Sequence, residues 1–260
     1  MTLSADLTVD ASAASLRRLV GIARLAGAEI LRWYGGTGVV EFKGDGSPLT
    51  VADRAANDLV VRELWAWTPR VPIVSEEDAI PAFEERQRWP AFWLVDPLDG
   101  TKEFLSGNGE FTVNIALITD RAPVLGVVFA PALGQCWYGG LGLGSWVEGS
   151  SGSATRIYSS PPAPGQPLVI VESRSHPSDR LEQYLKTVPV STRIRAGSSL
   201  KFCLVAEGKA DLYPRFGPTM EWDVAAGDCV YRNSGRDEPR RSSLVYNQPT
   251  LTNGDFVLGG

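Results

Sequence analysis

A short apolar strand that runs directly into two carboxylates constrains the fold of this chain more than any other feature. The segment Trp93–Thr101 reads W-L-V-D-P-L-D-G-T, so Asp96 and Asp99 stand three residues apart with Pro97 between them. Because proline has no N–H and a fixed φ, we expect the backbone to leave the strand ladder at this point. Both carboxylates can then turn toward one point, where the Leu98 carbonyl adds a third oxygen. Oxygen ligands of this kind suit Mg²⁺.

The turn after this strand contains two further signals. Gly100 permits a positive φ, and Thr101 is expected to begin a helix whose N-terminal amides favour an anion. Without other information, D-P-x-D-G-T is also typical of an ordinary strand-to-helix turn, in which Asp, Pro and Gly serve only the backbone.

Two more acidic segments favour the interpretation as a metal site. Glu76 and Glu77 follow a second apolar strand, and the sequence E-W-D ends at Asp223 just before a helix late in the chain. Carboxylates that converge without a cation repel one another, which raises their pKa values and lowers stability. Convergence of these acids therefore predicts a bound divalent cation.

Composition excludes several classes of protein. The 260 residues are 43% hydrophobic, which is enough for one large domain or two packed halves. No apolar run approaches the roughly 18 residues of a spanning helix, so no transmembrane segment is predicted. The net charge of −5, without a basic block, argues against a nucleic-acid polymer as a partner. The first fifteen residues lack the pattern of a secretory signal, so the cytoplasm is the expected location.

One histidine and three cysteines limit the available chemistry. His176 is the only histidine, so an H-E-x-x-H zinc site is excluded. Cys136, Cys203 and Cys229 lie far apart without C-x-x-C spacing, and we interpret them as reduced core residues. Oxygen ligands are therefore expected to carry the chemistry.

Hydrophobic periodicity predicts a mixture of helices and strands. Helices are expected over residues 16–31, 50–67, 178–186 and 199–207 and from about Asp223, and the second opens with a capping box of Thr50 and Asp53. Strands are expected over 71–74, 92–95, 111–118, 124–129, 168–171 and 210–215, with the third and fourth antiparallel. Gly, Ser and Pro between residues 148 and 167 predict a surface connection between two halves.

These motifs resemble, in order and over nearly the whole chain, those of the inositol monophosphatase superfamily. The matching segments are K-G-D-G-S-P-L-T-V-A-D (43–53), S-E-E-D (75–78), W-L-V-D-P-L-D-G-T-K-E-F (93–104), G-E-F-T-V-N-I-A-L (109–117), S-R-S-H (173–176), G-S-S-L-K-F-C-L-V-A-E-G-K-A-D-L-Y-P-R (197–215) and G-P-T-M-E-W-D-V-A-A-G (217–227). Within the superfamily, D-G-T-K-E-F, S-R-S-H and G-S-S-L-K-F-C are most similar to the CysQ-type 3′(2′),5′-bisphosphate nucleotidases. The resemblance implies an α/β chain with a layered αβαβα fold. The resemblance also implies that the chain divides into an α+β half over residues 1–155 and an α/β half over 156–260, with the active site between them.

The resemblance also implies roles for individual residues. It implies two or more Mg²⁺ ions, whose ligands are Glu76, Asp96, the Leu98 carbonyl, Asp99 and Asp223. Asp53 and Thr101 match the pair that activates the attacking water, with Glu76 beside them, although Asp53 also suits a helix start stabilised by the helix dipole.

The implied substrate-binding residues are Gly100, Thr101, Ser175, His176, Ser198, Ser199 and Lys201. Considered without the resemblance, His176 is typical of a hydrogen-bonded structural histidine. Ser199 and Lys201 are then typical of a serine helix cap beside a solvated lysine.

The implied reaction is hydrolysis of 3′-phosphoadenosine 5′-phosphate to AMP and phosphate in sulfate assimilation, with 3′-phosphoadenylyl sulfate as a further substrate and inhibition by Li⁺. The partner is then a small phosphorylated nucleotide, and the family resemblance also suggests a homodimer. Two alternatives stay open. One is a broader phosphatase acting on inositol monophosphate or fructose 1,6-bisphosphate, and the other is a non-catalytic, metal-dependent nucleotide-binding protein. The sequence assigns no role to Asp228 or to the Arg236–Arg241 loop.

Overall fold

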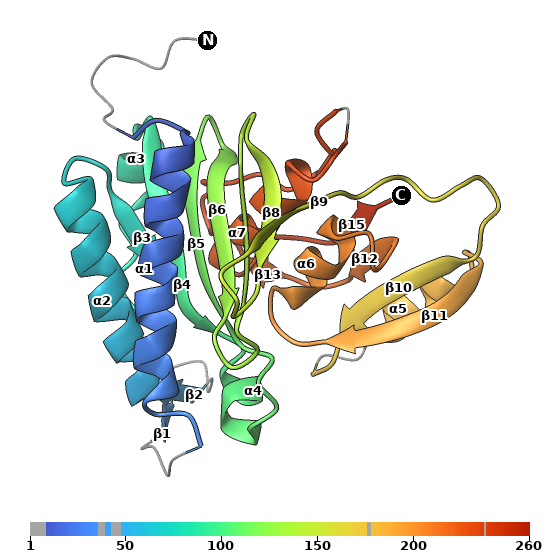
Figure 1. Ribbon diagram of the computed structural model, residues 1–260, viewed down its shortest axis with the longest axis horizontal. Helices are drawn as coiled ribbons and strands as arrows, with labels where there is room; N and C mark the ends of the chain where they lie inside the picture. Colours follow the sequence, from blue (N-terminus) through green and yellow to red (C-terminus); the bar gives the residue numbers. More distant parts are fainter. Residues whose placement is uncertain (1–8, 36–39, 43–47, 176–177, 237) are drawn as a thin grey trace.

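The computed structural model describes residues 9–35, 40–42, 48–175, 178–236 and 238–260 (Figure 1). Its first layer consists of two helices, α1 (Ala13–Leu31) and α2 (Val51–Trp67), which lie side by side. Thr50 caps α2, and its backbone N–H donates to the Asp53 carboxylate at 2.6 Å, so the predicted capping box is present. The apolar faces of both helices pack on the large sheet and form the first hydrophobic core.

The large sheet has seven strands in chain order, with β3 and β4 parallel and every later neighbour antiparallel. Its strands are β3 (Ile73–Ser75), β4 (Ala91–Asp99), β5 (Thr112–Thr119), β6 (Ala122–Ala130), β7 (Gln135–Gly140), β8 (Gly144–Glu148) and β9 (Ala154–Ile157). Strands β4 and β5 are almost continuously buried because helices cover both faces of the sheet.

A second core lies on the other face of this sheet. It is formed with α6 (Leu200–Ala206), α7 (Glu221–Arg232) and the inner face of a four-stranded sheet. That sheet has the order β11 (Val190–Ala196), β10 (Leu168–Ser173), β12 (Leu212–Arg215) and β15 (Phe256–Gly259), of which β15 is antiparallel to β12. Figure 1 shows α6 and α7 between the two sheets.

The last layer is α5 (Asp179–Leu185), which lies on the outer face of the small sheet. Ile194 of β11 packs on the second core, so its neighbour Arg193 faces the other way. Arg193 forms an ion pair with Glu182 of α5 at 2.5 Å, which places this helix on the outer face. The order of layers is therefore helix, sheet, helix, sheet, helix, as expected.

Short elements complete the described chain. They are β1 (Val40–Phe42) paired with β2 (Pro48–Thr50), α3 (Phe83–Arg86), α4 (Thr101–Ser106), and β13 (Thr219–Met220) paired with β14 (Thr252–Asn253). Within the described residues, the structure contains no helix of the length and hydropathy required to cross a bilayer.

Most elements expected from the sequence are present, with different boundaries in places. The strand expected at 71–74 begins at Ile73, and the one expected at 92–95 extends to Asp99. The connection expected over 148–167 contains β9, which adds an edge to the large sheet. The division at residues 155 and 156 stays a prediction; β9 crosses it, and α7 packs on the large sheet.

Candidate active site

The site begins where β4 leaves its regular pairing with β5. Asp96 is opposite Asn114 and Asp99 is opposite Thr112, so β4 has one extra residue over this interval. This irregularity lies at Pro97, where the sequence predicted a departure from the ladder. The N–H of Leu98 donates to the Asp96 carboxylate at 3.1 Å, which fixes the bend.

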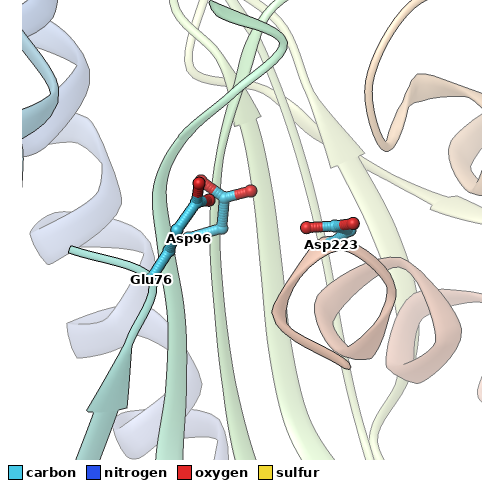
Figure 2. A group of neighbouring side chains, drawn as sticks. All are labelled: Glu76, Asp96 and Asp223. Carbon is cyan, nitrogen blue, oxygen red and sulfur yellow. The ribbon is translucent and has the colours of Figure 1, made fainter. Parts of the chain in front are cut away.

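Three carboxylates from distant segments meet at this bend. Glu76 follows β3, Asp96 lies on β4, and Asp223 is the third residue of α7. One oxygen of each lies within 4.8 Å of the other two. Figure 2 shows Glu76 and Asp96 next to each other, with Asp223 facing them from the first turn of its helix. The backbone N–H of Met220 donates to Asp223 at 3.1 Å and holds that carboxylate at the helix start.

These carboxylates are electrostatically strained without a cation. Burial raises the pKa of Asp96 well above its ordinary value, and the nearby charges of Glu76, Asp99 and Asp223 raise it further. Burial also raises the pKa of Asp223, followed by the effects of Asp99 and Glu76. A hard divalent cation removes this repulsion and accepts carboxylate oxygens, so the residues fit Mg²⁺.

Asp99 lines the same cavity as the three carboxylates. One of its oxygens accepts from Ser198 Oγ at 2.5 Å and from Asn114 Nδ2 at 3.2 Å. Leu98 also lines the cavity. The structure thus gathers the expected ligand set around one space, with Asp99 held by hydrogen bonds at its edge.

Asp53 and Thr101 are neighbours, although they are far apart in sequence. Gly100 has φ +88°, which glycine adopts readily, and Thr101 then begins α4 as expected. Thr101 Oγ1 lies 3.5 Å from Asp53 Oδ1. The other oxygen of Asp53 accepts from the Thr50 hydroxyl at 2.5 Å, so the carboxylate serves both as a cap and as a partner for Thr101.

The cavity of about 310 Å³ contains basic as well as acidic residues. Lys201 is 7% exposed, and burial lowers its pKa to about 8 even though Asp99 and Glu103 act to raise it. Its ammonium donates to the Ala196 carbonyl at 3.5 Å and to the carbonyl of Ser198. Lys201 is therefore a buried cation at the cavity wall, unlike the solvated lysine of the simpler interpretation.

Sequence reasoning missed two residues of this wall, Arg215 and Thr219. Both line the cavity, and within the described chain Arg215 Nε and Thr219 Oγ1 are buried without a hydrogen-bond partner. Arg215 ends a strand shortly before E-W-D and is the last residue of the matching segment 197–215. This position in the sequence was the signal that could have identified it. Unpaired buried donors of this kind fit a polar ligand.

The predicted substrate-binding residues lie in different surroundings. Gly100, Thr101, Ser198 and Lys201 line the cavity. Ser199 is buried, and its hydroxyl donates to the Asp223 carbonyl at 2.6 Å, while Ser175 donates to Glu103. His176 lies outside the described residues, as do Lys43 to Ser47 of the first matching motif.

Asp228 and the described part of the Arg236–Arg241 loop, to which the sequence assigned no role, lie outside the lining of this cavity. Asp228 is buried and accepts from Arg232 and from the Tyr246 hydroxyl, both at 2.8 Å, which indicates a structural role. The described residues of the Arg236–Arg241 loop line a separate cavity beside Tyr231. All three cysteines are buried and unpaired, so that prediction is confirmed.

This chain is similar to known proteins in sequence and in fold. The 3′(2′),5′-bisphosphate nucleotidase CysQ of Salmonella typhimurium is 50% identical over 217 residues, which cover 83% of this chain and 86% of that protein. The enzyme of the same name from Escherichia coli K12 is 48% identical, covering 85% and 88%. The crystal structure of CysQ from Bacteroides thetaiotaomicron matches with a TM-score of 0.77 and 37% identity over 95% of this chain and 97% of that one.

A more distant solved structure and a family model agree with these matches. The extragenic suppressor protein suhB from Bartonella henselae gives a TM-score of 0.73 at 28% identity, covering 86% of each chain. The model of the inositol monophosphatase family matches residues 13–243, which include every acidic segment described above. This chain therefore belongs to the inositol monophosphatase family.

Proposed function

We propose that this protein is a magnesium-dependent phosphatase that hydrolyses 3′-phosphoadenosine 5′-phosphate to AMP and phosphate. The observation that carries the proposal is one cavity with two chemical sides. Glu76, Asp96 and Asp223 form the acidic side, and Lys201 and Arg215, which line the same cavity, form the basic side. Relatives at 50% and 48% identity are 3′(2′),5′-bisphosphate nucleotidases, which supports a substrate with two phosphates.

The acidic side is the place for the metal. Glu76, Asp96, Asp99, Asp223 and the Leu98 carbonyl would hold two or more Mg²⁺ ions, since these described residues offer oxygen ligands there. Bound Mg²⁺ supplies positive charge that stabilises the phosphoryl group and the leaving oxygen. Substitution of Li⁺ for Mg²⁺ at such a site would inhibit the enzyme.

Thr101 and Asp53 handle the proton of the attacking water. Thr50 donates to one oxygen of Asp53, and the other oxygen lies 3.5 Å from Thr101 Oγ1. As the water attacks, Thr101 Oγ1 takes one of its protons and passes its own proton to Asp53 Oδ1. The new P–O bond forms as the bond to the 3′-oxygen breaks, and that oxygen takes a proton from solvent water and leaves as the hydroxyl of AMP.

The basic side receives the phosphate that does not react. Lys201 presents a buried ammonium and Arg215 a buried, unpaired Nε to the same cavity, and both suit an anionic oxygen. A ligand with one phosphate leaves the Arg215 Nε unpaired and the Lys201 ammonium with backbone carbonyls as its partners, which costs binding energy. The site is therefore expected to prefer a bisphosphate over a monophosphate, and 3′-phosphoadenylyl sulfate offers a similar second anion.

The cellular setting is also part of the proposal. Three unpaired, buried cysteines fit a reducing compartment, and we place the enzyme in the cytoplasm, in sulfate assimilation. A homodimer is suggested by the family resemblance, and sedimentation of the purified chain would test it.

The test is a comparison of substrates at one Mg²⁺ concentration. Phosphate release from 3′-phosphoadenosine 5′-phosphate should exceed release from inositol monophosphate and fructose 1,6-bisphosphate by at least about tenfold in kcat/KM. Chelation of the metal should stop release from all three substrates. Preference for inositol monophosphate would overturn the proposed substrate assignment. Tight nucleotide binding without any phosphate release would overturn the proposed phosphatase activity.

A further inference from the structure

Two glutamates, one on α4 and one shortly after it, connect this part of the chain to the ends of two strands of the small sheet. Glu103 lies on α4 and is buried, and Glu110 precedes β5. Neither belongs to the metal-binding carboxylates. Their partners are Arg174 and Ser175, directly after β10, and Gly197, directly after β11. We call these five residues the clamp.

Glu110 forms the charged part of the clamp. Its two oxygens accept from Nε and Nη2 of Arg174, both at 2.7 Å, in the bidentate geometry that fixes both side chains. One of these oxygens also accepts from the backbone N–H of Gly197 at 2.8 Å. Arg174 in turn donates to the Arg195 carbonyl at 2.8 Å. A single carboxylate thus holds the ends of two strands of the small sheet.

Glu103 and Gly197 bring the two sides into close contact. Glu103 accepts a hydrogen bond from the Ser175 hydroxyl. A Cβ at Gly197 would lie 2.8 Å from Glu103 Cγ and 2.9 Å from the Glu110 carbonyl oxygen, so only glycine allows this approach. The clamp therefore depends on backbone shape as well as on charge.

The clamp lies directly behind one wall of the active-site cavity. Glu103 lines the cavity, as do Ser173, just before Arg174, and Ser198, just after Gly197. Movement of the clamp would displace these wall residues, whereas Glu76 follows β3 and Asp96 lies on β4, both outside the clamp. Asp99, which accepts from Ser198, would keep its hydrogen bond from Asn114. The clamp thus controls the part of the cavity wall that Glu103, Ser173 and Ser198 form.

We propose that Glu110 is a positioning residue that, through Arg174 and Gly197, sets the wall that binds the nucleoside and its 5′-phosphate, and so selects nucleotides. This inference rests on the proposed function. A preformed wall lowers the entropy cost of binding a large ligand. Without the clamp, ordering of the wall would reduce the binding free energy of the nucleotide. A ligand that occupies only the reacting position does not contact this wall, so its binding free energy would not change.

The experiment compares Glu110→Ala with wild-type enzyme, whose nucleotidase activity is measured first. The KM for 3′-phosphoadenosine 5′-phosphate should rise about tenfold, with kcat within about twofold. Competitive inhibition by AMP should weaken by a similar factor, while inhibition by inorganic phosphate should not change. Glu110→Gln, which keeps an oxygen for the Gly197 N–H, should show a smaller change in KM.

A second variant and a control exclude a merely structural effect. Arg174→Ala should raise KM in the same way, and the double variant should be no worse than the worse single variant, because both remove one interaction. Glu148→Ala is the control, since it breaks the similarly exposed ion pair of Glu148 with Arg24 at 2.6 Å, away from the cavity.

Three results would overturn the clamp. One is an unchanged KM and AMP inhibition in both Glu110→Ala and Arg174→Ala. Another is an equal weakening of AMP and phosphate inhibition, and the third is the same KM change in Glu148→Ala. In each case wild-type turnover of the bisphosphate would still support the proposed function, so the two failures are distinguishable.

Discussion

Two groups of acidic residues on opposite faces of the small sheet balance their charge in different ways. Outside this sheet, Glu172 of β10 and Glu182 of α5 surround Arg193, with ion pairs of 2.5 Å to each, and Arg195 adds a contact of 3.0 Å to Glu172. Toward the large sheet, burial raises the pKa of Asp96, and the charges of the neighbouring acids raise it further.

The pKa shifts reflect this difference. Hydrogen bonding to Arg193 lowers the pKa of Glu182, and the two glutamates raise the pKa of Arg193. The pKa values of Asp96 and Asp223 are raised instead, first by burial and then by like charges. Acids that the chain neutralises itself stabilise the fold, whereas acids that it leaves in repulsion require a cation from solution.

The largest expected effect comes from removing one carboxylate of the repelling group. Asp96→Asn should reduce kcat by more than the roughly 100-fold that loss of an outer partner of a bound metal can cost. The same variant should unfold at a higher temperature than wild type in chelator, because it removes a buried charge held among other acids. Phosphate release and thermal unfolding measure the two effects.

Glu182→Gln is the matched control for this prediction, since it neutralises an acid that the chain already pairs. It should leave kcat unchanged and lower the unfolding temperature in chelator. Near-normal turnover in Asp96→Asn would contradict the metal role assigned to this carboxylate.

A second, intermediate effect is the pH dependence of the metal-free protein. Because the folded-state pKa values of Asp96 and Asp223 lie above the ordinary 3.8, the folded chain binds more protons than the unfolded chain between these values. The free energy of unfolding should therefore fall as pH rises through that interval, by at most about 1.4 kcal/mol per pH unit for each group. Thermal unfolding in chelator, from about pH 5 to about pH 8, measures this slope.

Magnesium supplies the control for the pH series. Saturating Mg²⁺ replaces the protons and should flatten the fall, and Asp96→Asn in chelator should reduce it. A stability that rises with pH in chelator would show that these carboxylates are not in net repulsion.

The comparison also explains what the sequence could predict. Local signals were sufficient for the bend at Pro97, the positive φ of Gly100 and the capping box of Thr50, because each depends on residues within one turn of chain. Convergence of Glu76, Asp96 and Asp223 followed from three acidic element ends and from the family resemblance, rather than from spacing.

Contacts between distant segments could not be predicted in this way. The orientation of Asp99 depends on Asn114 and Ser198, and the partner of Ser175 is Glu103 on α4. Arg215 shares the cavity with these acids only because β12 ends beside it. Such contacts arise from tertiary packing, which a local pattern does not encode.

The smallest expected effects come from the neutralised group and concern stability alone. Arg193→Ala removes two short ion pairs, one to Glu172 and one to Glu182. The Glu172 side chain is 4% exposed, and among the described residues its remaining ion-pair partner is then Arg195. We expect a loss of about 1 to 3 kcal/mol in the free energy of unfolding, since a buried charge loses a partner. Urea unfolding measures it, and kcat should not change.

Arg195→Ala sharpens the comparison because it removes a weaker contact from the same glutamate. The Arg195 side chain is 67% exposed and contacts Glu172 through one nitrogen at 3.0 Å. Because water surrounds most of this side chain, water can replace the contact at little cost in free energy. The expected loss is about 0.2 to 1 kcal/mol, as for exposed pairs. Its backbone carbonyl, which accepts from Arg174, is unaffected by the change, so KM should also stay constant. A loss equal to that of Arg193→Ala would mean that burial of Glu172, rather than the number of its partners, determines the stability of this group.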